Sequence, residues 1–450
     1  MASTYLTRTP ASATNRQTWT WSGWVKLSQF AGGAGSILFS AYAHAADNFK
    51  IAFSDTFKLS MRFYNNTEYQ LNLNRLFRDT SGWYHLVFAV DTTLATEADR
   101  FRIYVNGVRE TSFGQEDQPT QNLQMTINEA TATQIGRYST GDNYFNGSMS
   151  HIHFIDGTAY DASAFGETDA TTGIWKPKTN PSVTYGTNGF FLKFENSGAF
   201  GTDSSGNGNT FTVNGTMTQN IDTPSNVFAT LNPLSQGVAA TSRTFSNGNT
   251  SVTLGGADDS SLSSIGVSSG KWYAEFKITN DSADPTVGVG NEESVLVTNP
   301  GSCNIGGSTG AYGYYSDGRK KINGGSLTSY GDSFTTNDII GIALDLTNGA
   351  IWFSKNGTWQ ASATINEIEA GTTTNAAATS LSGTFFFGCS NSASGTTGDA
   401  FSVNFGNGYF GTTAVSSAQN PDDGIGIFEY DVPTGYYALN TKAINAQEYD

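Results

Sequence analysis

Residues 18–27 read TWTWSGWVKL, with Trp19, Trp21, Gly23 and Val25 at every second position. This period of two is typical of a β-strand with one buried face, because successive side chains point to opposite sides of a strand. Similar runs follow, separated by Gly, Asn and Asp: SILFSAY (36–42), FKIAF (49–53), FKLSMRFY (57–64), YQLNL (69–73) and WYHLVFAVD (83–91). No segment keeps a helical period. The pattern predicts a chain of many short antiparallel strands.

Two Asn-Gly dipeptides, Asn106-Gly107 and Asn146-Gly147, tolerate the positive φ that tight hairpin turns require. Around them, the stretches GWYHLVFAVDTT (82–93), FRIYVNGVRE (101–110) and IGRYSTGDNYFNGSMSHIHFIDGTAYD (135–161) resemble the laminin-G and pentraxin branch of the concanavalin A-like lectin fold. The phrase FGETDATTGIWKPK (165–178) and the residues after it resemble the continuation found in marine phage proteins of this kind. The resemblance implies a β-sandwich over residues 1–215.

A second series of strands begins after residue 240. Pro224 and Pro233 fix φ and remove backbone donors, so we expect residues 216–240 to form an extended linker. The opening GKWYAEF (270–276) and the pair IIGIALD and AIWFSKNG, joined by Asn348-Gly349, resemble a SPRY domain, which implies a second sandwich over residues 241–415. Residues 416–450 keep apolar and aromatic residues, so we expect this tail to dock on a domain. The expected fold class is all-β, with two antiparallel β-sandwich domains of the jelly-roll type in tandem.

Composition narrows the possible partners. The 450 residues are 37% hydrophobic and 13% aromatic, which favours folding, and two domains suit this length. With 23 Lys and Arg against 39 Asp and Glu, the net charge of −16 argues against nucleic acid and anionic membranes as partners. The sequence shows no targeting signal and no apolar run long enough for a membrane span, so we expect synthesis in a host cytoplasm.

The sequence contains little that matches the residue patterns of known catalytic sites. Retaining glycosidases of this fold use a Glu-x-Asp-x-x-Glu strand, and only Glu429-Tyr430-Asp431 begins that pattern, in the tail. His151 and His153 lie two positions apart, but no third metal ligand is evident. No nucleophile elbow precedes a helix. We therefore expect a protein that is not an enzyme.

Two loops offer oxygen ligands for calcium. Asp203, Ser205 and Asn207 match the first half of a calcium loop, and the alternative for them is an Asx turn. Asp142 and Asn143 form a second candidate pair, since lectins and pentraxins of this fold often bind Ca²⁺ in such loops. Calcium is the one cofactor that the sequence suggests.

Aromatic residues gather in the SPRY-like half, where exposed rings could stack against sugars. The candidate ligand-binding residues are Tyr312, Tyr314, Tyr315, Arg319, Tyr330 and Trp359. Packing in the core or in turns is the alternative for each of them.

The resemblances imply a bacteriophage virion protein of the tail-fibre or appendage type, which we expect to recognise a host surface glycan or protein receptor through its loops. The first alternative is a purely structural capsid-decoration or tail-connector protein that binds other virion proteins. A polysaccharide depolymerase is the other alternative, and the missing carboxylate pair argues against it. Trimers are common among phage fibres, although no segment of this sequence encodes a homo-oligomer.

Overall fold

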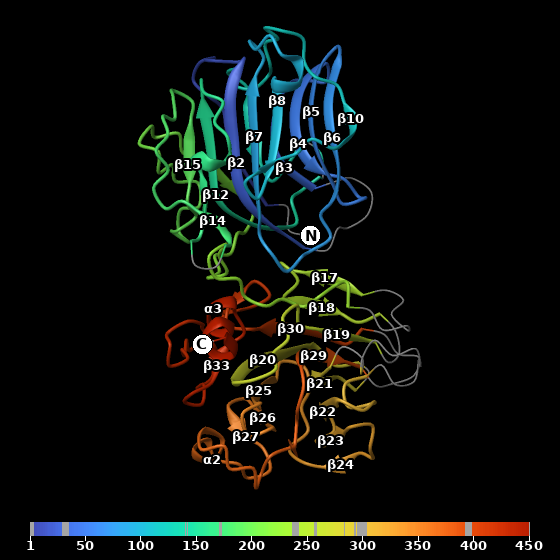
Figure 1. Cartoon of the computed structure of the whole chain (residues 1–450). Helices are drawn as coiled ribbons and strands as arrows, with labels where there is room; N and C mark the ends of the chain where they lie inside the picture. The colour runs from blue at the N-terminus through green and yellow to red at the C-terminus, as the bar shows by residue number, and fades with distance from the viewer. Residues whose placement is uncertain are drawn as a thin grey trace. The chain divides into compact units, whose positions relative to one another are not determined.

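The computed structural model describes residues 4–28, 36–139, 141, 143–170, 173–235, 243–255, 259–282, 284–291, 294, 304–391 and 398–449. The chain divides into two compact units, Met1–Gln219 and Asn220–Asp450. Each unit is built from β-sheets with few and short helices (Figure 1). The predicted fold class, two antiparallel β-sandwich domains of the jelly-roll type in tandem, is confirmed.

The first unit stacks an eight-stranded sheet on a six-stranded one. In spatial order the eight strands are β10 (Phe113–Glu116), β6 (Glu68–Leu76), β5 (Lys58–Asn65), β4 (Asp47–Phe53), β3 (Ser36–His44), β11 (Ala132–Ile135), β1 (Tyr5–Arg8) and β16 (Thr212–Asn214). The six strands are β15 (Phe190–Leu192), β12 (Gly147–Asp156), β2 (Thr18–Leu27), β7 (Tyr84–Asp91), β8 (Phe101–Val105) and β9 (Val108–Arg109).

The inner faces of these two sheets enclose the main core of the first unit. Trp19 and Trp21 of β2 are fully buried there, and the Trp19 ring meets Phe49 of β4 edge-on at 5.2 Å. These are the positions that the alternation in residues 18–27 assigned to the buried face.

The outer face of the six-stranded sheet is covered as well. The described part of residues 157–187 lies over it and includes β13 (Gly166–Thr168), β14 (Trp175–Pro177) and the 3₁₀ turn η2 (Ala162–Ala164). Phe165 and Ala162 pack there against Val87 and Ala89 of β7. Another 3₁₀ turn, η1 (Glu97–Asp99), precedes β8.

The second unit also stacks two sheets. The larger runs in the order β17 (Thr244–Ser246), β18 (Ser251–Thr253), β30 (Ala400–Asn404), β20 (Lys271–Asn280), β25 (Ile339–Asp345), β26 (Ala350–Lys355) and β27 (Thr358–Trp359), with β28 (Ala378–Thr379) on β26 and β33 (Tyr437–Ala438) on β20. The smaller runs β19 (Ser260–Leu262), β29 (Phe386–Ser390), β21 (Thr286–Gly290), β22 (Ala311–Tyr315), β23 (Arg319–Ile322) and β24 (Thr328–Ser329). The remaining elements are β31 (Tyr409–Phe410), β32 (Thr413–Ala414), α2 (Ile365–Glu369), α3 (Thr441–Ile444) and the π-helical turn η3 (Asn445–Tyr449).

Alternate residues of the central strand β20 belong to two cores. Trp272 and Phe276 point into the core between the sheets, whereas Tyr273 joins a second core on the outer face of the larger sheet. The tail supplies Phe428 and Tyr436 to this outer core, and β33 pairs with β20 in parallel.

The interval that we expected to be a linker, residues 216–240, contributes side chains to the second unit. Phe228 and Leu231 are buried in its cores, and Ala229 donates its backbone N–H to Leu439 O at 2.9 Å. Because Phe228 and Ala229 pair with the tail and Leu231 is buried, this part of the interval belongs to the core of the second unit. No helix within the described ranges is long and apolar enough to cross a membrane.

Candidate functional site

The three tyrosines of β22 are buried. Tyr312, Tyr314 and Tyr315 are 5%, 0% and 4% exposed. Tyr314 lies in the core beside Phe353 and donates its hydroxyl hydrogen to Asp332 O, while the Tyr315 hydroxyl donates to Ile305 O on the opposite face of the strand. The expectation that these rings face a ligand is corrected, because both faces of β22 are covered.

The other three residues of the predicted aromatic group do not join into one surface. Tyr330 is half-buried, meets Tyr314 at 5.4 Å and accepts a hydrogen bond from Phe353 N. Trp359 packs on the separate outer core, 6.4 Å from Tyr273. Arg319 is exposed and forms an ion pair with Asp317. The structure thus brings Tyr314 and Tyr330 together, but inside the fold.

The loop from Asp203 to Asn209 has the geometry of an Asx turn. Asp203 Oδ1 accepts from Phe191 N at 2.9 Å and Ser205 N at 2.8 Å, and Oδ2 accepts from Ser205 Oγ and Asn209 N. Asn207 donates to Gly186 O and Gly189 O. These bonds tie the loop to β15 and engage both carboxylate oxygens of Asp203.

The second calcium candidate lies partly outside the described residues. Asp142 lies outside the described residues, and Asn143 is half-buried in the loop before β12. No group of three His, Cys, Asp or Glu side chains in the described ranges is placed to hold a metal ion.

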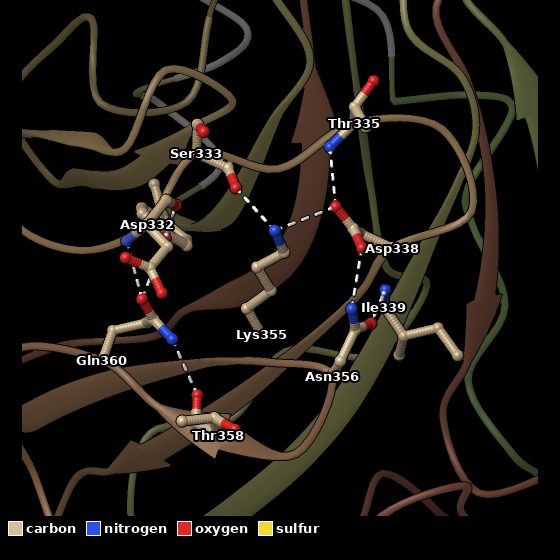
Figure 2. A network of polar contacts seen from close by, with 10 residues as sticks. Asp332, Ser333, Thr335, Asp338, Ile339, Lys355, Asn356, Thr358 and Gln360 are labelled. Carbon is tan, nitrogen blue, oxygen red and sulfur yellow. Dashed lines mark hydrogen bonds and ion pairs between the residues drawn. The ribbon is translucent and has the colours of Figure 1, made fainter.

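A polar network fastens one loop of the second unit to a hairpin (Figure 2). Lys355 Nζ donates to Ser333 O at 2.7 Å and lies 3.3 Å from Asp338 Oδ2. Asn356 Nδ2 donates to Asp338 Oδ1 at 2.7 Å, and Gln360 Oε1 accepts from Asp332 N. Residues 330–338 and 355–360 therefore form a fixed polar platform, which we call the loop platform.

Asp338 is the centre of this network. Partial burial acts to raise the pKa of its carboxyl group, but hydrogen bonds from Thr335 N and Asn356 and the charge of Lys355 together hold that pKa below its usual value. The carboxylate is thus ionised, and it fixes both the loop and the hairpin at neutral pH.

A buried group of polar and aromatic side chains lies on the outer face of the six-stranded sheet in the first unit. His85 is fully buried, its Nε2 lies 2.9 Å from Ser22 Oγ, and its Nδ1 accepts from Trp175 Nε1 at 2.9 Å. Trp24 stacks on the same imidazole at 4.8 Å. Burial lowers the pKa of His85 to about 3, so the ring is neutral.

The hydrogen bond between Ser22 and His85 runs in the opposite direction to that of a catalytic dyad. An indole N–H can only donate, so Trp175 fixes His85 Nδ1 as an acceptor and leaves the ring proton on Nε2. His85 therefore donates to Ser22 and cannot remove its hydroxyl proton. The pair stabilises the fold.

His151 lies within a β-bulge in the pairing of β12 with β2, and His153 is the first paired residue after it. His153 is buried, stacks on Phe191 at 3.9 Å and has its Nδ1 2.9 Å from the Tyr185 hydroxyl. His151 adopts a φ of 49° and lies 6.0 Å from the Phe191 ring, on the same outer face. Burial lowers the pKa of both imidazoles.

Two exposed apolar side chains lie in the segments next to this buried group. Val108 is 64% exposed and Ile174 is 59% exposed, more than any other large hydrophobic side chain in the described ranges. A Cβ atom on Gly107 would lie 2.9 Å from the Trp175 ring, so the residue before Val108 contacts the residue after Ile174. We call Val108, Ile174 and the half-buried Trp175 the apolar patch.

Sequence patterns missed the apolar patch, although one signal was present. Val108 directly follows the Asn106-Gly107 turn, where a polar residue is the usual choice. Ile174 carries no comparable signal, because its exposure depends on how β13 and β14 fold back over the sheet.

The matches to known families agree with this architecture. Residues 2–163 match the concanavalin A-like lectin/glucanases superfamily, and residues 271–407 match the SPRY domain family. The chain thus has an N-terminal concanavalin A-like domain and a C-terminal SPRY domain. Domains of these two kinds are typically binding modules without catalytic activity.

Two solved structures are similar to part of the chain. The SPRY domain of human HERC1 is 19% identical and its match covers 38% of this chain and 96% of that one, with a TM-score of 0.29. A human SPRY domain is 13% identical, with 34% and 89% covered and a TM-score of 0.22. The phage origin expected from the sequence stays a prediction.

Proposed function

We propose that this chain is a non-enzymatic bacteriophage virion protein, of the tail-fibre or appendage type, that recognises a host surface glycan or protein. The observation that carries the proposal is the tandem of two binding-type sandwiches, a concanavalin A-like domain and a SPRY domain, in one chain. The segment that begins at residue 165 resembles that of marine phage proteins, which supports the virion as its location.

The net charges of the two units suggest which unit binds the host and which binds other virion proteins. The first unit has 15 Lys and Arg against 18 Asp and Glu, a net charge of −3, whereas the second has 8 against 21, a net charge of −13. A cell surface rich in anionic polymers repels the second unit more strongly. We therefore assign host recognition to the first unit and attachment to other virion proteins to the second.

The apolar patch is the contact that we assign to recognition. Exposed apolar side chains and a partly exposed indole fit the apolar face of a sugar ring or of a protein side chain. The indole N–H is held by His85 at 2.9 Å, so the ring is fixed before a ligand arrives.

Two experiments test the proposal. Mass spectrometry of purified virions should detect the chain, and its absence from particles would refute a virion role. The full chain should bind host cells or components of a glycan array, and the Val108→Ser/Ile174→Ser variant should lose that binding. A variant with Val213→Ser, at another exposed position, serves as the control.

A purely structural decoration or connector protein is the second candidate. The loop platform favours it, because fixed backbone and charged groups suit a protein partner better than a sugar. A connector should be silent on cells and arrays and should co-purify with virion proteins. Release of reducing ends from host polysaccharide should stay undetectable, and a positive result would support a depolymerase instead.

A further inference from the structure

The outer face of the eight-stranded sheet in the first unit carries a row of polar side chains. The strand register pairs Ser40 of β3 with Lys50 of β4, Lys50 with Arg62 of β5, and Arg62 with Gln70 of β6. Each of these positions lies between two residues that belong to the core or pack against it, so the row points to the opposite face. Lys50, Arg62 and Gln70 are half-buried and therefore partly accessible.

Two cations lie opposite each other in this row, and only one of them has an anionic partner. The Arg62 guanidinium forms an ion pair with Glu68, with Nε 3.1 Å from Oε1, and donates from Nη1 to Asn48 Oδ1 at 3.1 Å. Lys50 Nζ makes no hydrogen bond or ion pair within the described residues and lies 5.3 Å from the centre of the Tyr138 ring. Like charges on directly paired strand positions are destabilising, so an anion bound at Lys50 would remove this cost.

Tyrosine rings lie around the two cations. Tyr138, in the loop after β11, meets Tyr42 of β3 edge-on at 5.9 Å, and the Arg62 guanidinium lies 5.2 Å from the centre of the Tyr64 ring. These three tyrosines are half-buried, so part of each ring is accessible to a ligand. Aromatic rings with a polar tip suit the apolar face and the hydroxyl groups of a sugar. We call Tyr42, Lys50, Arg62, Tyr64 and Tyr138 the Lys50 site.

Amide side chains continue from the Lys50 site to the edge of the sheet. Gln70 Nε2 donates to Asn72 Oδ1 at 2.6 Å, and Asn72 Nδ2 donates to Gln115 Oε1 of β10 at 2.9 Å. Amides can both donate to and accept from hydroxyl groups. Neighbouring strands lie about 4.8 Å apart, so the distance from β4 across β5 and β6 to β10 is about 14 Å. This length exceeds that of one sugar ring.

We propose that this face binds an acidic glycan, a chain of sugars that carry carboxylate groups, and that Lys50 binds one of those carboxylates. Arg62 is already paired with Glu68, so the ammonium group of Lys50 is the contact that remains for an anion. The tyrosines contact the sugar rings, and the amides of β6 and β10 contact their hydroxyl groups. The site lies on the other sheet from the apolar patch, and it does not depend on the assignment to a virion.

Calorimetric titration of the full chain with short oligogalacturonate and oligomannuronate tests the proposal. The methyl esters of the same chains are the control, because they keep the sugars and remove the charge. At least one acid should bind at least about tenfold more tightly than its ester, which corresponds to one charge-assisted hydrogen bond. Equal affinity for acid and ester, no binding of either acid, or tighter binding of dextran sulfate would overturn the proposal.

Variants locate the binding on this face. Lys50→Gln should weaken binding of the acid by at least about tenfold and leave the affinity for the ester unchanged. Arg78→Gln makes the same change of charge at an exposed position beyond the far end of β6, so it should bind both chains as the wild type does. Wild-type affinity of Lys50→Gln for the acid contradicts the proposal. The comparison of acid with ester needs no variant, so it decides the matter if Lys50→Gln does not fold.

The result is separable from that of the proposed function. The Val108→Ser/Ile174→Ser variant should bind the acidic chains as the wild type does. Loss of that binding would place the glycan at the apolar patch and overturn this inference, while recognition by the first unit would stand. Binding that depends on Lys50, in a chain that is absent from virions, would refute the virion role alone.

Discussion

In each unit a segment folds back over the outer face of one sheet and seals a titratable side chain beneath it. In the first unit the described part of residues 157–187 covers His85 and His153. In the second unit the tail residues Phe428, Glu429 and Tyr430 cover Glu275. Burial favours the uncharged form of the titratable side chain in both units. In the first unit this form is the deprotonated imidazole of His85 or His153, and in the second it is the protonated carboxyl group of Glu275. The same architecture therefore gives opposite responses to pH.

Removal of one aromatic ring from each seal tests whether the two are equivalent. Phe428→Ala and Phe165→Ala each delete a buried ring, so each should cost about 3–5 kcal/mol in the free energy of unfolding of its own unit. Chemical denaturation followed by hydrogen exchange assigns each loss to a unit. If either variant weakens the other unit as much as its own, the comparison fails.

Acid should weaken the first unit. The pKa of His85 is lowered from 6.5 to about 3, so its contribution to stability is complete above pH 6.5 and is lost as the pH falls toward the folded value. At about pH 4.5 the loss from this residue amounts to about 3 kcal/mol. Chemical denaturation of the wild type and of His85→Gln, at about pH 4.5 and above pH 6.5, measures this loss of stability. The variant should lose less stability on acidification than the wild type.

Base should weaken the second unit. The pKa of Glu275 is raised from 4.5 to about 7, so its stabilising contribution is complete in acid and is lost as the pH rises through 7. Between about pH 4.5 and about pH 8.5 the second unit should lose about 3 kcal/mol. Denaturation curves at a series of pH values show whether the second unit loses stability as the pH rises. A gain in stability over this range would contradict the opposite pH responses of the two units.

Trp175→Phe tests whether the hydrogen bond from Trp175 to His85 stabilises the first unit. The substitution keeps the ring but removes the donor to His85 Nδ1, which leaves a buried acceptor without its partner. A loss of about 1–3 kcal/mol is expected in the denaturation of the first unit. No loss would mean that the indole N–H does not fix the imidazole.

The smallest effect on stability should come from the apolar patch. Val108 and Ile174 are mostly exposed, so the change of each to Ser should alter the free energy of unfolding by no more than about 0.5 kcal/mol. The same variants should lose binding to the host surface. A large stability loss would show that these side chains belong to the seal over His85 instead.

Alternation along single strands predicted the sandwiches well, because the inner face of each strand packs against a partner sheet. It placed Trp19, Trp21 and Val25 correctly in the core. It could not predict that the opposite face of the same strand, with Ser22 and Trp24, is also buried, because the covering segment comes more than 130 residues later.

The predicted binding residues show the same limit. Tyr312 and Tyr314 lie on a strand with both faces covered, and the sequence near them does not reveal the cover. At Asp203 the ambiguity is local, because a carboxylate followed by small polar residues suits both a calcium loop and an Asx turn. The burial of Glu275 was not predicted from the sequence, because a single acidic residue in a strand has no sequence pattern that indicates burial.

The pairing of the first and last segments of the second unit has a consequence for its synthesis. Phe228 bridges Asn440, and Thr441 N donates to Val227 O at 3.0 Å. A ribosome adds these partners more than two hundred residues apart, so the unit cannot close until nearly all of its chain has emerged. Translation that stops before residue 440 should therefore leave an open, protease-sensitive product rather than a shorter folded one.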